Sequence, residues 1–136
     1  MTNREKGEKV TLTLTLYGRP ITKKNSLRVA RRGKRILVLP SKQYETYEKD
    51  CLKQITGNYK LKIGTPCNMS CRYFMPTRHR VDLVNLLEAT CDILVKAGVL
   101  KDDNSNIIKS HDGSRVLYDA LNPRVEIEIR GVEELE

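Results

Sequence analysis

Several carboxylates with a possible chemical role lie in or next to one helical stretch of the sequence, residues 79–103. Asp82 precedes the first leucine of the helix, Glu88 lies within it, and Asp102 and Asp103 follow it. Carboxylate oxygens without convincing His or Cys partners suit a hard ion such as Mg²⁺ or Mn²⁺. If the chain entering at Asp103 packs beside the start of the helix, three carboxylates converge. The spacing therefore predicts a metal site of Asp82, Glu88 and one of the two aspartates, Asp102 or Asp103, that could activate a water molecule.

The position of Glu88 is unusual for a charged residue. At about 100° per residue, one stripe of the helix holds the expected core residues, Leu83, Leu86, Leu87, Thr90, Leu94 and Ala97. Glu88 belongs instead to a second band, with Val84, Cys91 and Val95. We therefore expect its carboxylate to be partly desolvated and to need a cation, hydrogen bonds or a metal ion as compensation.

The other acids also have structural alternatives. Asp82 lies where a helix N-cap is expected, and capping is compatible with metal binding. Asp102 and Asp103 could form a solvated acidic turn after Gly98. Because neighbouring side chains of an extended segment point in opposite directions, only one of the pair is expected to face the site. Both remain candidate catalytic residues.

The distribution of charge points to a polyanionic partner. The net charge is +8, yet residues 1–62 hold 16 Lys and Arg against 5 Asp and Glu, whereas residues 63–136 hold 9 against 12. A merely solvated basic loop is the plain alternative. A basic half joined to clustered carboxylates favours a metal-dependent phosphodiesterase. The expected DNA contacts are Lys23, Lys24, Asn25, Arg31, Arg32, Lys34 and Arg35, with Arg78 and Arg80 nearer the metal.

The elements that must position these side chains follow from local patterns. Alternation or short apolar runs predict strands at 10–17, 35–40, 67–75, 106–110, 115–118 and 124–130. Spacings of three and four predict helices from the cap at Ser41 to about Ile55 and over about 83–97, and residues 18–34 are interpreted as a long basic loop. The order predicts a single α+β (α/β-like) domain over 1–136, a mixed sheet packed with two main helices, with 1–8 and 131–136 frayed.

Composition restricts the remaining classes. No run approaches the roughly 20 apolar residues of a membrane span, and the polar N-terminus lacks a signal-type apolar stretch. We therefore expect a cytoplasmic protein without a membrane partner, in which Cys51, Cys67, Cys71 and Cys91 are reduced thiols. Cys67 and Cys71 could form half of a zinc site, but they lie in an alternating strand and no second Cys or His pair accompanies them.

The segment MPTRHRVDLVNLLEATCDILVKAGVLKDD, residues 75–103, resembles the signature of RusA-type Holliday-junction resolvases. That family shows Met-Pro and arginines before D-L-D-N-L, then an Asp-Ala-Leu-like helix centre, an Ala-Gly stop and a D-D pair. PITKKNS (20–26) and SKQYETYEKD (41–50) resemble its N-terminal Pro…Asn segment and its first helix. The resemblance implies a RusA-like fold and a homodimeric endodeoxyribonuclease, common in phages and prophages, that resolves four-way junctions in DNA recombination and repair.

Two positions depart from the family pattern. The family's catalytic set is three aspartates and a lysine, which by position are Asp82, residue 84, Asp103 and residue 88, and Asn85 matches the signature asparagine. Residue 84 is Val84 in this chain and residue 88 is Glu88. Because residues four apart share a helix face, Glu88 could supply the carboxylate that is missing at Val84. The alternative is a degenerate resolvase that binds branched DNA without cutting it.

Further roles stay open for residues near the acids. Lys101 and Lys109 flank them and could replace the family's lysine, although either could be an ordinary surface residue. His111 and Asp112 fall in an SHDG segment that is most simply a tight turn, with a supporting role also possible. The second helix band could contribute to a dimer face, and a twofold dimer would match the near-twofold symmetry of a junction.

Two other classes of protein compete with a nuclease. A noncatalytic DNA-binding module would be indifferent to divalent metal. A structural nucleic-acid-binding protein of ribosomal type would explain the basic half of the chain but would leave the carboxylate cluster unexplained.

Overall fold

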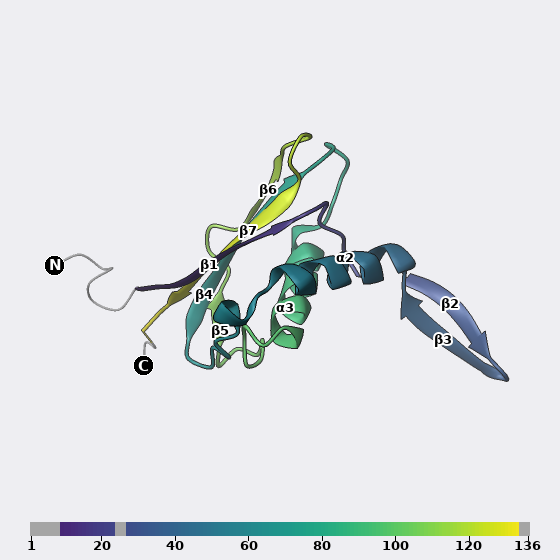
Figure 1. The fold of residues 1–136 in the computed structure, drawn as a ribbon, viewed down its shortest axis with the longest axis horizontal. Coiled ribbons are helices and arrows are strands. Elements are labelled where there is room, and N and C mark those ends of the chain that lie inside the picture. Colours follow the sequence, from purple (N-terminus) through teal and green to yellow (C-terminus); the bar gives the residue numbers. More distant parts are fainter. Residues whose placement is uncertain (1–8, 24–26, 134–136) are drawn as a thin grey trace.

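The computed structural model describes residues 9–23 and 27–133, which form one mixed sheet, two helices and a separate hairpin (Figure 1). The elements are β1 (Lys9–Tyr17), β2 (Leu27–Arg32), β3 (Arg35–Pro40), α2 (Lys42–Gln54), the 3₁₀ turn η2 (Gly57–Tyr59), β4 (Cys67–Met75), α3 (Leu83–Lys96), β5 (Ile108–Ser110), β6 (Arg115–Tyr118) and β7 (Arg124–Gly131). The predicted α+β class is confirmed.

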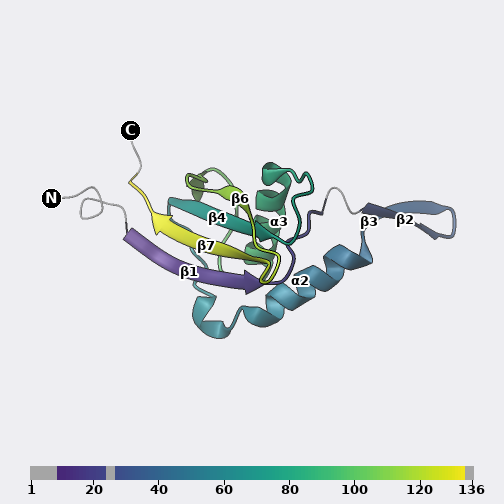
Figure 2. The same ribbon diagram turned by 90° about the horizontal axis from the view of Figure 1, so that it is seen from above.

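The main sheet is centred on two long strands, β4 and β7. Its order is β1-β7-β4-β5, and β6 also pairs with β4. β7 runs antiparallel to both β1 and β4, whereas β5 and β6 are parallel to β4. α2 and α3 lie on the same side of this sheet, as the two views together show (Figures 1 and 2). The other face of the sheet carries no helix within the described residues.

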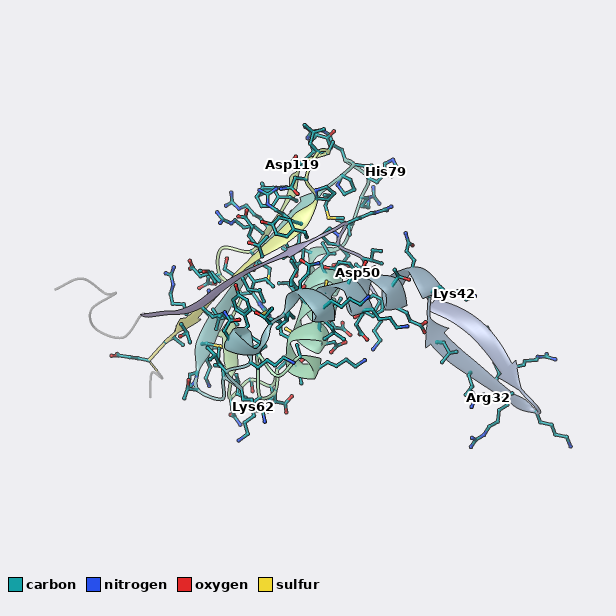
Figure 3. All side chains as sticks on the ribbon, in the orientation of Figure 1. Arg32, Lys42, Asp50, Lys62, His79 and Asp119 are labelled. Atoms are coloured by element: carbon teal, nitrogen blue, oxygen red, sulfur yellow. The ribbon has the colours of Figure 1, made fainter. Side chains whose placement is uncertain are left out.

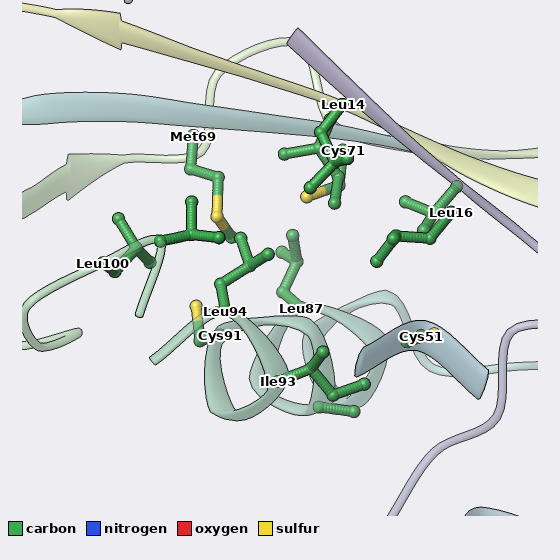
Figure 4. Close-up of a cluster of buried hydrophobic side chains, with 14 of the residues drawn as sticks. Leu14, Leu16, Cys51, Met69, Cys71, Leu87, Cys91, Ile93, Leu94 and Leu100 are labelled. Atoms are coloured by element: carbon green, nitrogen blue, oxygen red, sulfur yellow. The ribbon is translucent and has the colours of Figure 1, made fainter. Parts of the chain in front are cut away.

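The core forms where the inward residues of three strands meet the two helices. Alternate residues are buried along β1, β4 and β7, because a one-sided core selects every second side chain of a strand. Leu14, Met69 and Cys71 from the strands lie close to Leu87 and Leu94 of α3 (Figure 4). The alternation predicted for these strands is confirmed.

Both helices begin at a capping side chain, and α3 also ends in a glycine motif. The Ser41 hydroxyl accepts a hydrogen bond from the Tyr44 amide at the start of α2, and an Asp82 carboxylate oxygen accepts one from the Val84 amide at the start of α3. α3 ends at Lys96, and Gly98 follows the C-cap residue Ala97. Gly98 has φ 81° and its amide donates to the Val95 carbonyl, while the Val99 amide donates to the Leu94 carbonyl. This is a Schellman-type terminus, for which a left-handed glycine is favoured.

The segment 18–34, interpreted from its charge as a long loop, is partly a strand. Residues Leu27–Arg32 form β2 and pair antiparallel with β3 through Val29↔Val38 and Arg31↔Ile36. The two-residue turn between them starts at Gly33, whose φ of 60° suits the first position of a type II′ hairpin turn. The interpretation as a loop was wrong because the many cations obscured the alternation of Leu27 and Val29. β5 is also shorter than predicted, since residues 104–107 form a turn.

The four cysteines are free and buried, as expected of reduced thiols. Burial raises the pKa of Cys51 to about 11 and that of Cys71 and of Cys91 to about 12, so these thiols stay protonated at neutral pH. Among the described residues, no helix has both the length and the apolar character to cross a membrane.

A buried hydroxyl pair joins α3 to β4 and generates the first prediction. Thr90 donates to the Leu86 carbonyl, so the Tyr73 hydroxyl must donate to Thr90, at 2.6 Å. Thr90→Val keeps the shape but removes the oxygen that accepts from the buried Tyr73 hydroxyl, which should lower the free energy of unfolding by about 1–3 kcal/mol. Tyr73→Phe should cost less, because Thr90 keeps its bond to Leu86. Urea unfolding of both variants measures the difference, and equal costs would contradict this direction of the bonds.

Candidate functional site

Two carboxylates, Glu88 and Asp103, lie within electrostatic reach of a third, Asp92 of α3. Glu88 and Asp92 are one helical turn apart, and Asp103 comes from the loop after the helix. Burial raises the pKa of Asp92, and the negative charges of Asp103 and Glu88 raise it further. Asp92 is half-buried and Glu88 is exposed. The structure therefore gathers Glu88 and Asp103, two of the predicted ligands, around a third acid that was not predicted from the sequence.

One lysine faces these acids. The Lys23 ammonium lies 3.8 Å from a carboxylate oxygen of Asp92, and the two side chains are 45% and 39% exposed. Its positive charge lowers the pKa of Asp92 and so opposes the neighbouring acids. Such a loose, exposed pair contributes little to stability. It does place an ammonium from the basic N-terminal half of the chain directly beside the carboxylates of α3.

The two neighbouring aspartates after α3 differ in role. The Asp102 carboxylate accepts hydrogen bonds from the Asp103 amide, at 2.8 Å, and from the side-chain amide of Asn104, at 3.2 Å. Asp102 therefore shapes its own loop. Asp103 acts toward the helix, because its charge contributes to raising the pKa of both Cys91 and Asp92. The expectation that only one of the pair faces the site stays a prediction.

The structure confirms the predicted cap at Asp82 but not the predicted surroundings of Glu88. Asp82 uses one carboxylate oxygen to cap α3, as predicted. It precedes Glu88 by six residues, a rise of about 9 Å along a helix axis. Glu88 is exposed and Val84 is 67% exposed, so the expected partial desolvation of Glu88 was wrong. Burial of Ala89 and Ile93 turns the residues 84, 88 and 92 outward, whereas Cys91 of the expected band is in the core.

The donor types near α3 fit a hard cation, but they are not arranged around one point. Within residues 9–23 and 27–133, no group of three or more His, Cys, Asp or Glu side chains is placed to hold a metal ion. Glu88 and Asp103 are exposed, so their side chains can turn without disturbing the core. The assignment of Asp82, Glu88 and Asp103 as metal ligands accordingly stays a prediction.

Lys101 and Lys109, which the sequence offered as replacements for the family's lysine, do not share the position of Lys23. The aliphatic stem of Lys101 runs against Gly64, where a Cβ atom would meet its Cδ at 3.1 Å. Lys109 is exposed on the short strand β5. Lys23 was predicted as a DNA contact alone, and its place beside Asp92 was missed because 69 residues separate them in the chain. Asp92 was missed although its spacing of four from Glu88 was the signal that could have found it.

His111 and Asp112 form the tight turn that the sequence favoured. Asp112 exchanges hydrogen bonds with the Asn68 side chain through its amide and carbonyl, and His111 Nδ1 lies 3.0 Å from the Met69 carbonyl. A carbonyl only accepts, so Nδ1 of His111 carries the proton. Asp112 lines a hollow of about 910 Å³ with Asn68 and Arg72 on the sheet face that lacks helices. This places Asp112 on the opposite side of the sheet from α3.

The predicted DNA-contacting cations are in two groups. Arg31, Arg32, Lys34 and Arg35 are exposed at the far end of the β2–β3 hairpin, and Figure 3 shows Arg32 there, away from Lys42 at the hairpin's base. The second group precedes α3. The Arg78 guanidinium lies 4.2 Å from the ring centre of Tyr118, Arg80 is exposed, and Asn85 is half-buried. Lys24 and Asn25 lie outside the described residues.

Fold and site together define a small α+β domain that carries carboxylates on one helix and a cationic hairpin. The family model described as endodeoxyribonuclease RusA matches residues 18–130. The chain therefore belongs to the RusA endodeoxyribonuclease family, a family of Holliday-junction resolvases that bind branched DNA. A search of curated proteins found no match. The match includes both the hairpin and α3. It confirms the family that residues 75–103 indicated and extends the likeness to most of the chain.

The charge around Asp92 generates a prediction of pH dependence. A raised pKa means that the folded protein takes up a proton more readily than the unfolded chain, so this carboxylate lowers stability as pH rises through its folded pKa. Asp92→Asn should therefore be more stable than the native chain at about pH 7, and the difference should shrink at about pH 4. Urea unfolding at both pH values measures this difference in stability, with Asp112→Asn as the control. A difference that does not change with pH would contradict the prediction.

Proposed function

We propose that this protein is a divalent-metal-dependent, structure-selective endodeoxyribonuclease that resolves four-way DNA junctions by phosphodiester hydrolysis in recombination or repair. The family match over residues 18–130 carries the proposal, because it includes the helix that holds the candidate acids. The electrostatic grouping of Glu88, Asp92 and Asp103 beside Lys23 supports it. We include a phage or prophage origin in the proposal because such an origin is common in the family that the chain resembles.

Each acid has a proposed role. Asp82, Glu88 and Asp103 would hold Mg²⁺ or Mn²⁺, and Asp102 would keep the loop in the shape that presents Asp103. Bound there, such an ion would supply a water of lowered pKa and neutralise charge that develops on the scissile phosphate. Asp92 would hold Lys23 near the scissile phosphate, where its ammonium could take over the charge-neutralising part of the family's lysine.

The paired changes at residues 84 and 88 support a relocated ligand. Both side chains are exposed on the same side of α3, one turn apart. Valine provides no ligand atom, while the longer glutamate can reach back toward the N-terminal turn of the helix. Exchange of the acid from residue 84 to residue 88 keeps the number of carboxylates and removes the family's lysine from position 88. Lys23 then offers the missing positive charge from another part of the chain.

A twofold homodimer is the proposed assembly, because a four-way junction presents two scissile strands in near-twofold symmetry. The exposed Val84 at the start of α3 is available to such an interface, whereas Cys91 of the same predicted band is buried in the core. The second candidate function is a branched-DNA-binding protein of the same fold that cannot cut. The departure at Val84 is the observation that favours this alternative.

Cleavage of a synthetic four-way junction tests the proposal. The native chain should cut the junction with Mg²⁺ or Mn²⁺ and not in the presence of EDTA. Glu88→Gln and Asp103→Asn should each lower the rate at least roughly a hundredfold, since removal of a metal ligand takes away several kcal/mol of transition-state stabilisation. Their affinity for the junction should be kept. Gel analysis of labelled strands measures the rates, with Asp112→Asn as the matched acid-to-amide control on the other sheet face.

Two outcomes of this assay would change the conclusion. Undiminished cleavage by Glu88→Gln would remove Glu88 from the site and with it the relocated ligand. Tight junction binding by the native chain, with no cleavage in either metal, would select the noncutting alternative.

Salt-dependent binding tests the role of the hairpin cations. Arg31→Gln combined with Arg32→Gln should weaken binding to junction and to duplex DNA alike, because cations that bind phosphates carry no sequence information. The slope of log affinity against log salt should flatten by about 0.9 for each phosphate that the variant no longer neutralises. Fluorescence anisotropy over a salt series measures both effects. Lys49→Gln combined with Lys53→Gln removes the same charge from the exposed side of α2, and an equal effect in this control would contradict a specific role of the hairpin.

A further inference from the structure

The β2–β3 hairpin, residues 27–40, exposes most of the side chains whose burial is described. It projects from the body just before α2, and Figures 1 and 2 show it as an arm with its turn farthest away. Its strands pair extensively only with each other among the described elements. Six residues per strand at about 3.3 Å each give an arm of about 20 Å. A free two-stranded hairpin is marginal in water, so an arm of this kind gains order from a partner.

One face of the arm is apolar although it lies in solvent. The register places Val29 opposite Val38 and Arg31 opposite Ile36, so these four side chains share one face. Val29, Ile36 and Val38 are 70%, 64% and 63% exposed. Leu37 and Leu39 alternate onto the other face and are half-buried. The exposed face therefore holds three β-branched side chains that no part of the described chain covers.

The far end of the same arm is strongly cationic. Arg31, Arg32, Lys34 and Arg35 are exposed there within five consecutive residues. This charge selects a polyanion as the partner, and it opposes stacking of two arm ends from two copies of the chain. Phosphates cannot cover the apolar face, however, because valine and isoleucine offer them no hydrogen bond. The partner must present an apolar surface bordered by phosphates.

Unstacked bases next to a DNA backbone are such a surface. In an intact duplex the flat faces of the bases are hidden by stacking, whereas at a branch point the stack is interrupted. Proteins that kink DNA insert apolar side chains between base steps and hold the flanking phosphates with cations. A two-stranded ribbon is also narrow enough for the major groove, but there it would meet polar base edges. The composition of the arm favours the interrupted stack over the groove.

We propose that the arm is a branch-point wedge: Val29, Ile36 and Val38 pack against unstacked bases at the centre of a DNA junction while the four cations at its end hold the flanking phosphates. This inference rests on the proposed binding of branched DNA and adds how the branch is distinguished from duplex. The body of the protein, with the acids of α3, is then held beside a strand that leaves the branch point.

Substitution of the apolar face tests the wedge. Val29→Thr, Ile36→Thr and Val38→Thr are combined, because threonine keeps a high strand propensity while making the face polar. The probe is a synthetic four-way junction with 2-aminopurine at the branch point, and a duplex of the same arm sequence is the comparison. The native full-length chain should raise 2-aminopurine fluorescence and should bind the junction more tightly than the duplex.

The triple variant should bind the junction at least roughly tenfold more weakly and should show no fluorescence rise, while duplex affinity changes by less than about twofold. Leu121→Ser removes another exposed apolar residue, 97% exposed in the loop before β7, and should change neither. Circular dichroism and light scattering on each variant establish that fold and molecular mass are kept.

Each other outcome overturns the inference in a distinct way. Unchanged junction affinity and fluorescence in the triple variant exclude the wedge. Equal weakening on junction and duplex places the arm in a groove, and a change in molecular mass makes a second copy of the chain the partner. A native chain that binds junction and duplex equally defeats the proposed function itself, whereas junction preference kept by the triple variant defeats only the wedge.

Discussion

The packing of α3 on β4 determines which helix residues can take part in any chemistry. The buried bond between Tyr73 and Thr90 and the contact of Leu87 and Leu94 with the sheet fix the rotation of the helix about its axis. A rotation by one residue would move each side chain by about 100° and would bury what is now outside. The outward stripe of residues 84, 88 and 92 is therefore set by the core, not by the acids themselves.

Sequence predicts most of this scaffold because its signals are local. Alternation in β1, β4 and β7 follows from a core on one face of the sheet, which is a property of each strand alone. The cap at Asp82 and the stop at Gly98 likewise depend on a few neighbouring residues. These features position α3 at both ends, so the order of elements and the bounds of the helix could be inferred without knowledge of any distant contact.

The features that could not be predicted from sequence depend on contacts between distant segments, or lie in the arm, which has no hydrophobic core of its own. The arm has two faces without the usual inward and outward contrast, so its cations dominated the pattern and concealed β2. Glu88 was expected among apolar neighbours because a helical wheel cannot tell which of two adjacent bands the sheet will cover. The approach of Lys23 to Asp92 joins two segments that share no local pattern.

The separation of charge in the fold suits the proposed function, in which acids and cations of one small protein serve the same substrate. Cations at the end of the arm lie about 20 Å from its base, which exceeds the Debye length of about 8 Å at physiological ionic strength. The arm cations therefore do not neutralise the acids of α3, and the acids do not weaken the attraction of these cations for phosphate. Lys23 lies beside Asp92 and can offset part of the repulsion between those acids and an approaching phosphate. In the proposed function, a DNA strand long enough to reach from the arm to α3 would be held by the distant cations while its scissile phosphate meets the acids.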